Sequence, residues 1–289
     1  MTPTRSRAEP QFFNVYDLPW EIVETVGLLA GLEQRMISHD TETGASTHMA
    51  RIRPGWHTDT GGLGVAVEFV VVEGQLAVDG QLLKVGGYAR IPAVLGSVPI
   101  ESELGCQAYV FLSSDPEAES EATVRTTSFW DEPWEEGLLN KLPQRWKSLR
   151  LPDPGDGPVH GGPRGLLRVM QWLPGFIAPM EHVHSVWEEL IFLSGDWIAG
   201  EWGAVAPGSY LSSPAGFWHA PVSTRTGALA IVHSDLPLDL TQRDCEGGPE
   251  LTRAYLDETS MLELPKHEGE AFLARFGVSL PSKSGAASE

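Results

Sequence analysis

The sequence predicts an all-β protein that contains two copies of one strand-rich unit. Short runs of apolar and β-branched residues alternate with turns, supplied by 31 glycines and 22 prolines. The second half repeats landmarks of the first, and helical periodicity is weak and lies outside the repeated blocks. Antiparallel strands about ten residues apart are typical of a sandwich or small barrel.

Four landmarks recur in the same order, 120 to 122 residues apart. The pairs are Pro54-Gly55 with Pro174-Gly175, Glu68–Gly74 with Glu189–Gly195, Gly86–Pro92 with Pro207–Pro214, and Leu104–Asp115 with Thr226–Asp235. A nearly constant offset over four landmarks indicates an internal duplication. We therefore expect the same fold twice in one chain of 289 residues.

The strands can be placed from their apolar runs and the glycines or prolines that bound them. We expect strands at Val65–Val72, Gln75–Val78, Leu82–Val85, Gln107–Leu112, Leu166–Trp172, Glu189–Leu193 and Leu229–His233. Helices are expected only as short flanking elements, at Leu18–Leu32, at Glu135–Leu142 and around Glu268–Phe276.

These elements divide the chain into an N-terminal unit at residues 1–118, a linker at 119–158 and a C-terminal unit at 159–289. The linker is inferred from the polar, proline-rich composition of Ala118–Asp156. The last residues, from about Ser282, are expected to fray, as chain ends commonly do.

Composition excludes several function classes. The formal net charge is −19 and no Lys/Arg cluster is present, so a nucleic acid or an anionic membrane surface would be repelled. The two cysteines, Cys106 and Cys245, offer neither a disulfide framework nor a C-x-x-C zinc site. No apolar run approaches the length of a membrane span. We expect a soluble, cytoplasmic protein whose partner is a small molecule.

The most informative residues are His182, His184, Glu188 and His219. Residues two apart on a strand share one face, so both imidazoles of the H-V-H sequence can point the same way. Glu188 lies at an even offset, and His219 is far enough along the chain to return on a neighbouring strand. Three imidazoles and one carboxylate suit a divalent first-row transition metal such as Fe, Zn, Mn or Ni.

These spacings resemble the two motifs of the cupin superfamily. In the first, Glu188 follows H-x-H after three residues and Gly195 follows after six more. The second motif is matched in spacing by Gly208, Pro214, Gly216 and His219. One departure is that six residues, not five, separate Gly175 from His182. The resemblance implies two tandem cupin barrels of jelly-roll type, a bicupin.

Among cupins, the ChrR-like group is most similar to the segment H-V-H-S-V-W-E-E-L-I-F-L-S-G. This group includes zinc-binding anti-sigma factors and an iron dioxygenase that cleaves hydroxyaryl ketones. This resemblance assigns the ligand role to Glu188, with Glu189 as the alternative. It implies one divalent metal in the C-terminal cupin, Fe(II) in first place. In the first copy, Val67 and Ser97 stand at the Glu188 and His219 positions, which leaves only His57 and Asp59 and predicts no metal there.

Other residues are candidates for the surroundings of the metal. Large apolar side chains near the motifs predict a substrate pocket formed by Met170, Trp172, Trp187 and Phe192. His233 and Tyr210 are the candidate catalytic residues, His233 as a proton shuttle or a group that orients a ligand. A strand-capping role beside Asp235 is the alternative for His233. Arg168 is a weaker pocket candidate.

The resemblance implies a metal-dependent bicupin enzyme, a non-haem iron dioxygenase acting on a small carbonyl or hydroxyaryl compound. A redox-neutral isomerase or cyclase would use the same metal, and a non-enzymatic sensor or binding cupin remains a separate class. The absence of paired cysteines argues against an anti-sigma factor. Because exposed strand edges in such barrels are often covered by a second copy, we expect a homodimer.

Overall fold

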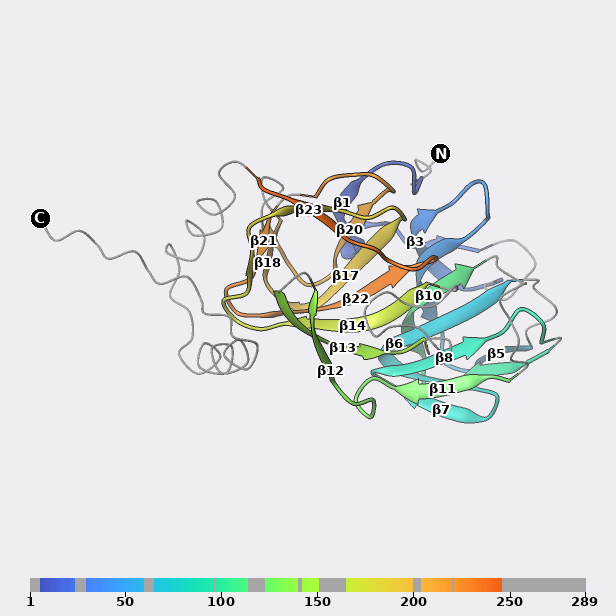
Figure 1. The fold of residues 1–289 in the computed structure, drawn as a ribbon. Helices are drawn as coiled ribbons and strands as arrows, with labels where there is room; N and C mark the ends of the chain where they lie inside the picture. The colour runs from blue at the N-terminus through green and yellow to red at the C-terminus, as the bar shows by residue number, and fades with distance from the viewer. Residues whose placement is uncertain are drawn as a thin grey trace, which may run out of the picture.

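The computed structural model describes residues 6–23, 30–59, 65–95, 97–113, 123–139, 142–150, 165–199, 204–219 and 221–245. Within these residues the protein is almost entirely β, and the one helical element is the 3-10 turn η1 (Val15–Asp17). No helix in this part of the chain is long and apolar enough to cross a membrane. The strands form two units that lie side by side (Figure 1).

The first unit is a ten-stranded sheet whose main path runs β11-β8-β6-β10-β4-β3-β2, with β5, β7 and β9 attached off this path. Its strands are β2 (Glu21–Ile22), β3 (Glu33–His39), β4 (Ser46–Ile52), β5 (Trp56–Asp59), β6 (Ala66–Val78), β7 (Gln81–Lys84), β8 (Gly87–Ile91), β9 (Pro99–Ser102), β10 (Cys106–Ser113) and β11 (Arg125–Ser128). All strand pairs in it are antiparallel.

The second unit has a seven-stranded sheet in the order β1-β20-β17-β22-β14-β13-β12, a four-stranded sheet β15-β21-β18-β19 and the pair β16-β23. Its strands are β1 (Gln11–Asn14), β12 (Glu135–Leu139), β13 (Leu142–Ser148), β14 (Leu166–Trp172), β15 (Ile177–Ala178), β16 (Glu181–Val183), β17 (Glu188–Gly195), β18 (Trp197–Ala199), β19 (Ala204–Val205), β20 (Ser209–Ser213), β21 (Val222–Ser223), β22 (Ala228–Ser234) and β23 (Thr241–Arg243).

The internal duplication extends to strand order and to local irregularities. The series β8-β6-β10-β4-β3-β2 in the first sheet corresponds to β20-β17-β22-β14-β13-β12 in the second. Each copy has a register shift in the pairing of its long central strand, β6 with β10 and β17 with β22. Each also has a positive-φ glycine, Gly74 or Gly195, packed against the backbone of a second one, Gly105 or Gly227. The two copies therefore share one backbone design.

The expected linker differs from the observed structure. Three strands lie within residues 119–158: β11 joins the first sheet beside β8, while β12 and β13 extend the second sheet from β14. The N-terminal strand β1 crosses over and pairs with β20 of the second sheet. Polar and proline-rich composition concealed these strands, of which β11 pairs with the distant β8 while β12 and β13 pair with each other.

Two of the expected helices are also corrected. Glu135–Leu139 is strand β12. In the Leu18–Leu32 region, Glu21–Ile22 is strand β2, and residues 24–29 lie outside the described residues. Both elements pair with a neighbouring strand, so tertiary hydrogen bonding overrides a weak helical propensity. The tail helix expected around Glu268–Phe276 lies outside the described residues.

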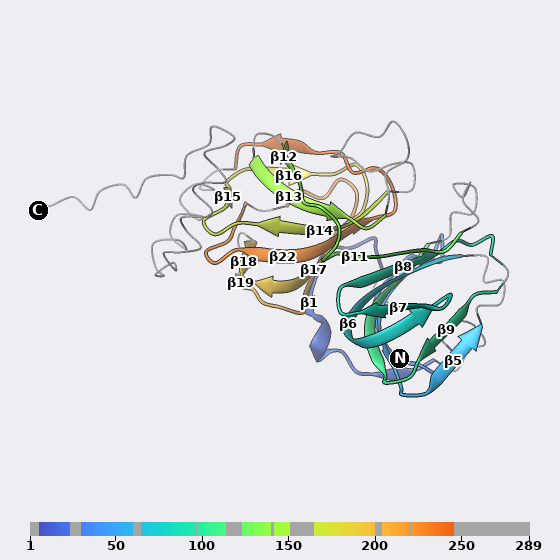
Figure 2. The ribbon, with the colours of Figure 1, turned by 90° about the horizontal axis from the view of Figure 1, so that it is seen from below.

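Three apolar clusters make up the core. One fills the first unit around Val67, Phe69 and Val110. A second fills the C-terminal unit around Trp172 and Trp197. The third lies between the units and combines side chains from both, including Val70, Tyr88, Tyr109, Leu167, Ile191 and Tyr210. Strand alternation explains this arrangement, because successive residues of β6 face the first core and the contact between units in turn. The two units also lie side by side in the view of Figure 2.

Two buried glutamates, related by the repeat, reach across this contact in opposite directions. Glu68 of β6 accepts hydrogen bonds from Arg150 and Tyr88. Glu189 of β17 accepts hydrogen bonds from the hydroxyls of Thr47 and Ser38, at 2.6 and 3.3 Å. Both carboxylates have no exposed surface, so these partners replace water. Burial opposes ionisation of Glu68, but Arg150 and Arg90 outweigh it and lower its pKa to about 2.

We predict that Glu68→Gln lowers the free energy of unfolding by about 3–5 kcal/mol, because Arg150 would remain buried without its carboxylate partner. Urea unfolding followed by tryptophan fluorescence measures the change. Glu73→Gln on the same strand is the control, since Glu73 is exposed and should change stability little. A Glu68→Gln variant as stable as the wild type would contradict a role for this pair in holding the units together.

The same group predicts a pH dependence. The folded-state pKa of Glu68 lies below the usual value of 4.5, so its stabilisation is complete above pH 4.5 and is lost as pH falls towards 2. Between about pH 5 and pH 2.5, the range in which carboxylates titrate, the free energy of unfolding should decline less steeply for Glu68→Gln than for the wild type. Parallel pH profiles would show that Glu68 does not titrate in this range.

At two positions related by the repeat, the backbone of one glycine lies close to that of another: Gly74 beside Gly105, and Gly195 beside Gly227. Gly74 and Gly80 have the same φ of 72°, but a methyl group at Gly74 would collide with the carbonyl oxygen of Gly105, whereas Gly80 has open space. Gly80→Ala should cost about 1–2 kcal/mol of strain, and Gly74→Ala about 1–3 kcal/mol more. Thermal unfolding of both variants measures the difference, and equal losses would exclude the close approach as the cause.

Candidate metal centre

Three histidines of the second unit meet at one end of its barrel. His182 lies on β16, His184 follows it after one residue, and His219 pairs with His182 as an isolated antiparallel bridge. The two bridging backbones exchange hydrogen bonds, from His219 N to His182 O at 2.8 Å and in the reverse direction at 3.4 Å. The chain therefore brings residues of both sequence motifs together through main-chain pairing.

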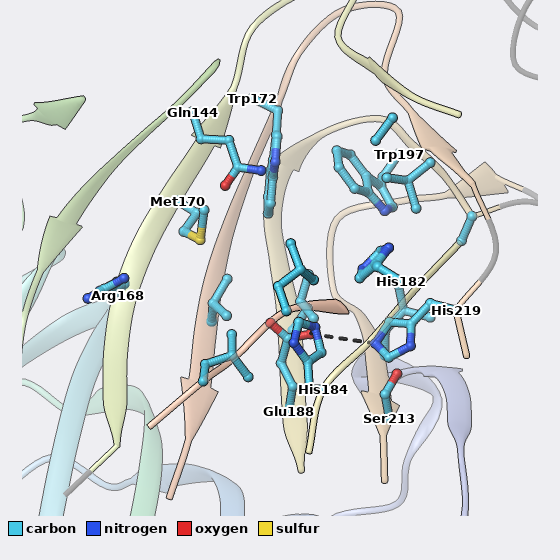
Figure 3. Close-up of a pocket in the computed structure, with 18 of the residues that line it drawn as sticks. Gln144, Arg168, Met170, Trp172, His182, His184, Glu188, Trp197, Ser213 and His219 are labelled. Carbon is cyan, nitrogen blue, oxygen red and sulfur yellow. Dashed lines mark ion pairs between the residues drawn. The ribbon is translucent and has the colours of Figure 1, made fainter. Parts of the chain in front are cut away.

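The side chains form a compact group. One ligand atom from each of the three histidines lies within 4.8 Å of the others. Glu188, the first residue of β17, places its Oε2 3.3 Å from His184 Nε2 and 3.7 Å from His219 Nε2. Figure 3 shows the carboxylate beside the imidazoles within one cavity. Glu188, and not Glu189, is the carboxylate next to the histidines.

Hydrogen bonds on the far side of each ring fix the direction in which two imidazoles point. His184 Nδ1 donates to the carbonyl of Asp239, and His219 Nδ1 donates to the carbonyl of Phe217 at 2.8 Å. A carbonyl only accepts, so in a neutral ring the lone pair is on Nε2. Both Nε2 atoms are buried without a well-directed hydrogen bond. An imidazole that binds a metal typically donates its Nδ1–H to an acceptor, which fixes the ring, and keeps the lone pair on Nε2 for the metal.

Burial and mutual repulsion set the charges of the group. Burial, followed by the neighbouring His219 and His184, lowers the pKa of His182 to about 3, so this ring is neutral at physiological pH. Burial disfavours the imidazolium form of His184, but Glu188 outweighs it and raises the pKa of His184. Burial also opposes ionisation of Glu188, yet the two imidazoles lower its pKa and keep it a carboxylate. The group thus offers imidazole nitrogen and anionic oxygen together.

The four side chains line a partly enclosed cavity of about 120 Å³. Its walls are mainly apolar and come from the seven-stranded sheet, the four-stranded sheet and residues 238–242 (Figure 3). The lining side chains used below are Gln144, Trp146, Arg168, Met170, Trp172, Phe176, Trp197, Leu238, Leu240 and Gln242. An apolar cavity with a few convergent polar groups is the usual form of a small-molecule site.

The expected pocket residues divide into two groups. Met170 and Trp172 line the cavity, because even-numbered residues of β14 face the barrel interior. Trp187 and Phe192 are not among its lining residues. The Trp187 indole instead lies against the Arg7 guanidinium at 3.8 Å, and Phe192 packs behind Trp197 in the barrel core, with their ring centroids 5.9 Å apart.

The two expected catalytic residues lie outside the cavity. His233 is fully buried in the contact between the units, where its Nδ1 lies 2.8 Å from Glu189 Oε1 and its ring packs against Phe111. Tyr210 belongs to the apolar cluster of the same contact. Alternation explains both positions, since Val232 of β22 and Leu211 of β20 line the cavity and their neighbours His233 and Tyr210 face the other way. The Nε2 atom of His233 lies 3.3 Å from Asp235 Oδ1, a contact that agrees with the alternative role at the strand end beside Asp235.

Sequence reasoning missed two sources of cavity residues. Gln144 and Trp146 come from β13, inside the segment expected to be a linker. Leu238 and Leu240 come from the stretch that leads into β23, and Gln242 belongs to β23 itself, which pairs with β16. The alternation of Gln144 and Trp146 with charged Arg145 and Lys147 was a strand signal available in the sequence.

The first unit lacks an equivalent group among the residues that the structure describes. Val67, at the Glu188 position, is fully buried in an apolar core, and Ser97, at the His219 position, is exposed. His57 is also exposed, and the Asp59 side chain lies outside the described set. The single cluster of three or more metal-ligating side chains in the described chain is that of the second unit.

Comparison with known proteins supports the fold. No protein-family model and no curated protein sequence matches the chain. A structure from Nostoc punctiforme named "putative dioxygenase" is 18% identical, covers 81% of this chain and 84% of its own, and has a TM-score of 0.65. An oxalate decarboxylase from Lactobacillus farciminis is 11% identical over 89% and 94% of the two chains, with a TM-score of 0.51.

A third structure, a cupin 2 conserved barrel domain protein from Leptotrichia buccalis, is 11% identical over 78% of this chain and 96% of its own, with a TM-score of 0.51. Identities this low establish shared architecture only. Together with the repeated sheet order and the two apolar barrel cores, they confirm the fold class expected from the sequence. The protein therefore has an all-β cupin fold, with two barrels in tandem.

Proposed function

We propose that this protein is a metal-dependent bicupin enzyme, a non-haem iron dioxygenase that acts on a small carbonyl or hydroxyaryl compound. The observation that carries the proposal is the convergence of His182, His184, His219 and Glu188 on one partly enclosed, mainly apolar cavity. His184 and Glu188 are buried and His182 and His219 half-buried, and the Nε2 atoms of His184 and His219 face the Glu188 carboxylate without a well-directed hydrogen bond.

The donor set fits a divalent transition metal. Neutral imidazoles and one carboxylate are ligands of Fe, Zn, Mn and Ni alike. His182, His184, Glu188 and His219 would hold the ion, which would act as a Lewis acid and a template for an oxygen-chelating substrate. Asp239 and Phe217 would keep two of the rings oriented through their carbonyl groups.

The remaining cavity residues would bind substrate and exclude water. Trp172, Trp197 and Phe176 form a stacked and tilted aromatic group, with ring centroids 4.4 to 6.0 Å apart. Such a wall suits a flat apolar compound and keeps the reacting atoms dry. The dioxygenase assignment is supported by the resemblance to ChrR-like cupins and by the printed name of the Nostoc punctiforme structure.

The first test is metal content. We predict about one metal ion per chain in protein purified without added metal or chelator, and its loss in His182→Ala, because removing one ligand of four weakens the site. His57→Ala is the matched control, since His57 is an exposed histidine of the first barrel. Elemental analysis of the three proteins decides between the outcomes. Metal-free wild-type protein, or equal metal in His182→Ala, would contradict the site.

The second test is oxygen uptake by iron-loaded protein with 1,3-diketones and hydroxyaryl ketones, followed with an oxygen electrode. We predict uptake in the wild type and in His57→Ala, and none in Glu188→Gln. Product formation without oxygen uptake would favour a redox-neutral isomerase or cyclase. Stoichiometric zinc with no turnover would favour a sensor or binding cupin, because a closed zinc site is typically structural.

A further inference from the structure

One extended segment, residues 236–243, forms a side of the candidate metal cavity. This segment, which we call the strap, follows β22 and ends in β23. Leu238, Leu240 and Gln242 line the cavity and are half-buried, whereas the odd-numbered residues of the strap are exposed. The alternation gives the strap one face towards the candidate ligands and one face towards solvent. The strap is therefore a wall one strand thick, and its displacement would open the cavity to water.

A short ladder joins the main chain of the strap to the strand that carries His182. In the part of the chain that the structure describes, β23 and β16 form a two-stranded sheet separate from the larger sheets. The paired residues are Glu181 with Arg243, His182 with Gln242, and Val183 with Thr241. A two-stranded ladder is only marginally stable by itself, so the side-chain contacts of the strap matter for its closure.

The end of the strap contacts residues that adjoin the metal ligands in both motifs. Arg243 Nε donates a 2.6 Å hydrogen bond to Glu181 Oε2, and the Arg243 guanidinium lies 4.0 Å from the centre of the Trp218 ring. Glu181 precedes His182 in the chain, and Trp218 precedes His219. The Arg243 side chain is exposed, and exposed ion pairs contribute little stability. These contacts align the strap with both motifs without fixing it firmly.

Asp239, in the middle of the strap, makes the contacts that lead directly to the metal centre. Its backbone carbonyl accepts the hydrogen bond from His184 Nδ1, and its carboxylate Oδ1 accepts a 2.6 Å hydrogen bond from the backbone N–H of Ser185. On the other side of the His184 ring, Nε2 lies 3.3 Å from Glu188 Oε2 (Figure 3). One strap residue thus holds both the ring of a candidate ligand and the backbone that follows it.

We propose that Asp239 is a positioning residue whose carboxylate latches the strap to Ser185 and thereby couples closure of the cavity to metal binding by His184. The proposal rests on the proposed function in that His184 holds a metal ion. With the strap closed, the Asp239 carbonyl keeps the hydrogen on Nδ1 and directs the Nε2 lone pair into the cavity. With the strap displaced, the ring can turn and three lining side chains leave the wall. The metal then binds more weakly and water enters.

The first experiment measures metal affinity with Zn²⁺, an ion that imidazole and carboxylate ligands bind well. The full-length protein competes for zinc with a fluorescent chelator. Asp239→Ala removes the acceptor for Ser185, and we expect it to bind zinc roughly 10- to 100-fold more weakly, the usual effect of removing a group that orients a metal ligand.

Two further variants separate the hydrogen bond from the charge. Asp239→Asn keeps an acceptor oxygen but loses the negative charge, so its zinc affinity should stay close to that of the wild type. Asp244→Ala removes an exposed carboxylate just beyond the strap and is the matched control. Thermal unfolding of each variant without zinc shows whether the fold is intact.

The second experiment follows the strap itself by hydrogen exchange and mass spectrometry, with and without saturating zinc. Coupling between two sites is reciprocal, so bound zinc should slow exchange of the amides of residues 236–243 in the wild type. The slowing factor should be at least as large as the affinity lost in Asp239→Ala, because the variant can lose no more than the full coupling. Exchange in β7 of the first barrel should not respond to zinc.

The outcomes separate this proposal from the metal centre. Wild-type zinc affinity in Asp239→Ala, or a strap whose exchange zinc does not slow, overturns the coupling and leaves the metal centre standing. Loss of affinity in Asp239→Asn equal to that in Asp239→Ala also overturns it, since charge alone would then explain the loss. No zinc binding by the wild type overturns both proposals. If Asp239→Ala does not fold, the Asp239→Asn affinity and the exchange of the wild-type strap decide the question.

Discussion

The alternation of side chains along β17 is the constraint on which the site and the assembly of the two barrels both depend. Glu188 faces the barrel interior and lies beside His184 and His219, while Glu189 faces the other unit and bonds Thr47. Successive residues of a strand point to opposite faces, so one shift of register would exchange the two roles. Neither carboxylate could then keep its partners. The positive-φ Gly195 and the register shift before it fix where this strand ends against β22.

The equivalent strand of the first barrel keeps only the outward half of this arrangement. Glu68 still reaches the neighbouring unit and bonds Arg150, but the inward position is Val67, which packs in an apolar core. The two barrels therefore share the inter-unit contact and differ inside. Phe111 and His233, which occupy corresponding positions in the repeat, pack against each other with ring centroids 4.8 Å apart. The contact between the units thus joins corresponding faces of the two copies, as expected for an internal duplication.

The sequence predicted the strands that carry a strong local signal and missed those that depend on distant partners. Leu166–Trp172 has the bounds predicted for it, and Met170 and Trp172, which alternation puts on one face of this strand, both line the cavity. Strands β11, β12 and β13 lay in a polar segment, where the partner of β11 is distant and the alternating pattern of β13 was overlooked. His233 was expected in the pocket, but it lies on the other face of its strand. Sequence alone does not show that this face meets the contact between the barrels, where His233 lies beside Glu189.

The difference between the barrel interiors follows from the free energy of burying polar groups. The buried His184 and Glu188 inside the second barrel destabilise the folded chain relative to an apolar filling. The first barrel has that apolar filling, from Val67 to Val110, and shares a large apolar contact with the second. We infer that the first barrel acts as a packed support for a second barrel whose interior is shaped for ligands. A bound metal ion would return stability to the second barrel by linkage, because it binds the folded state and not the unfolded chain. The duplication thereby allows one copy to retain an unfavourable, chemically useful interior while the other supplies packing.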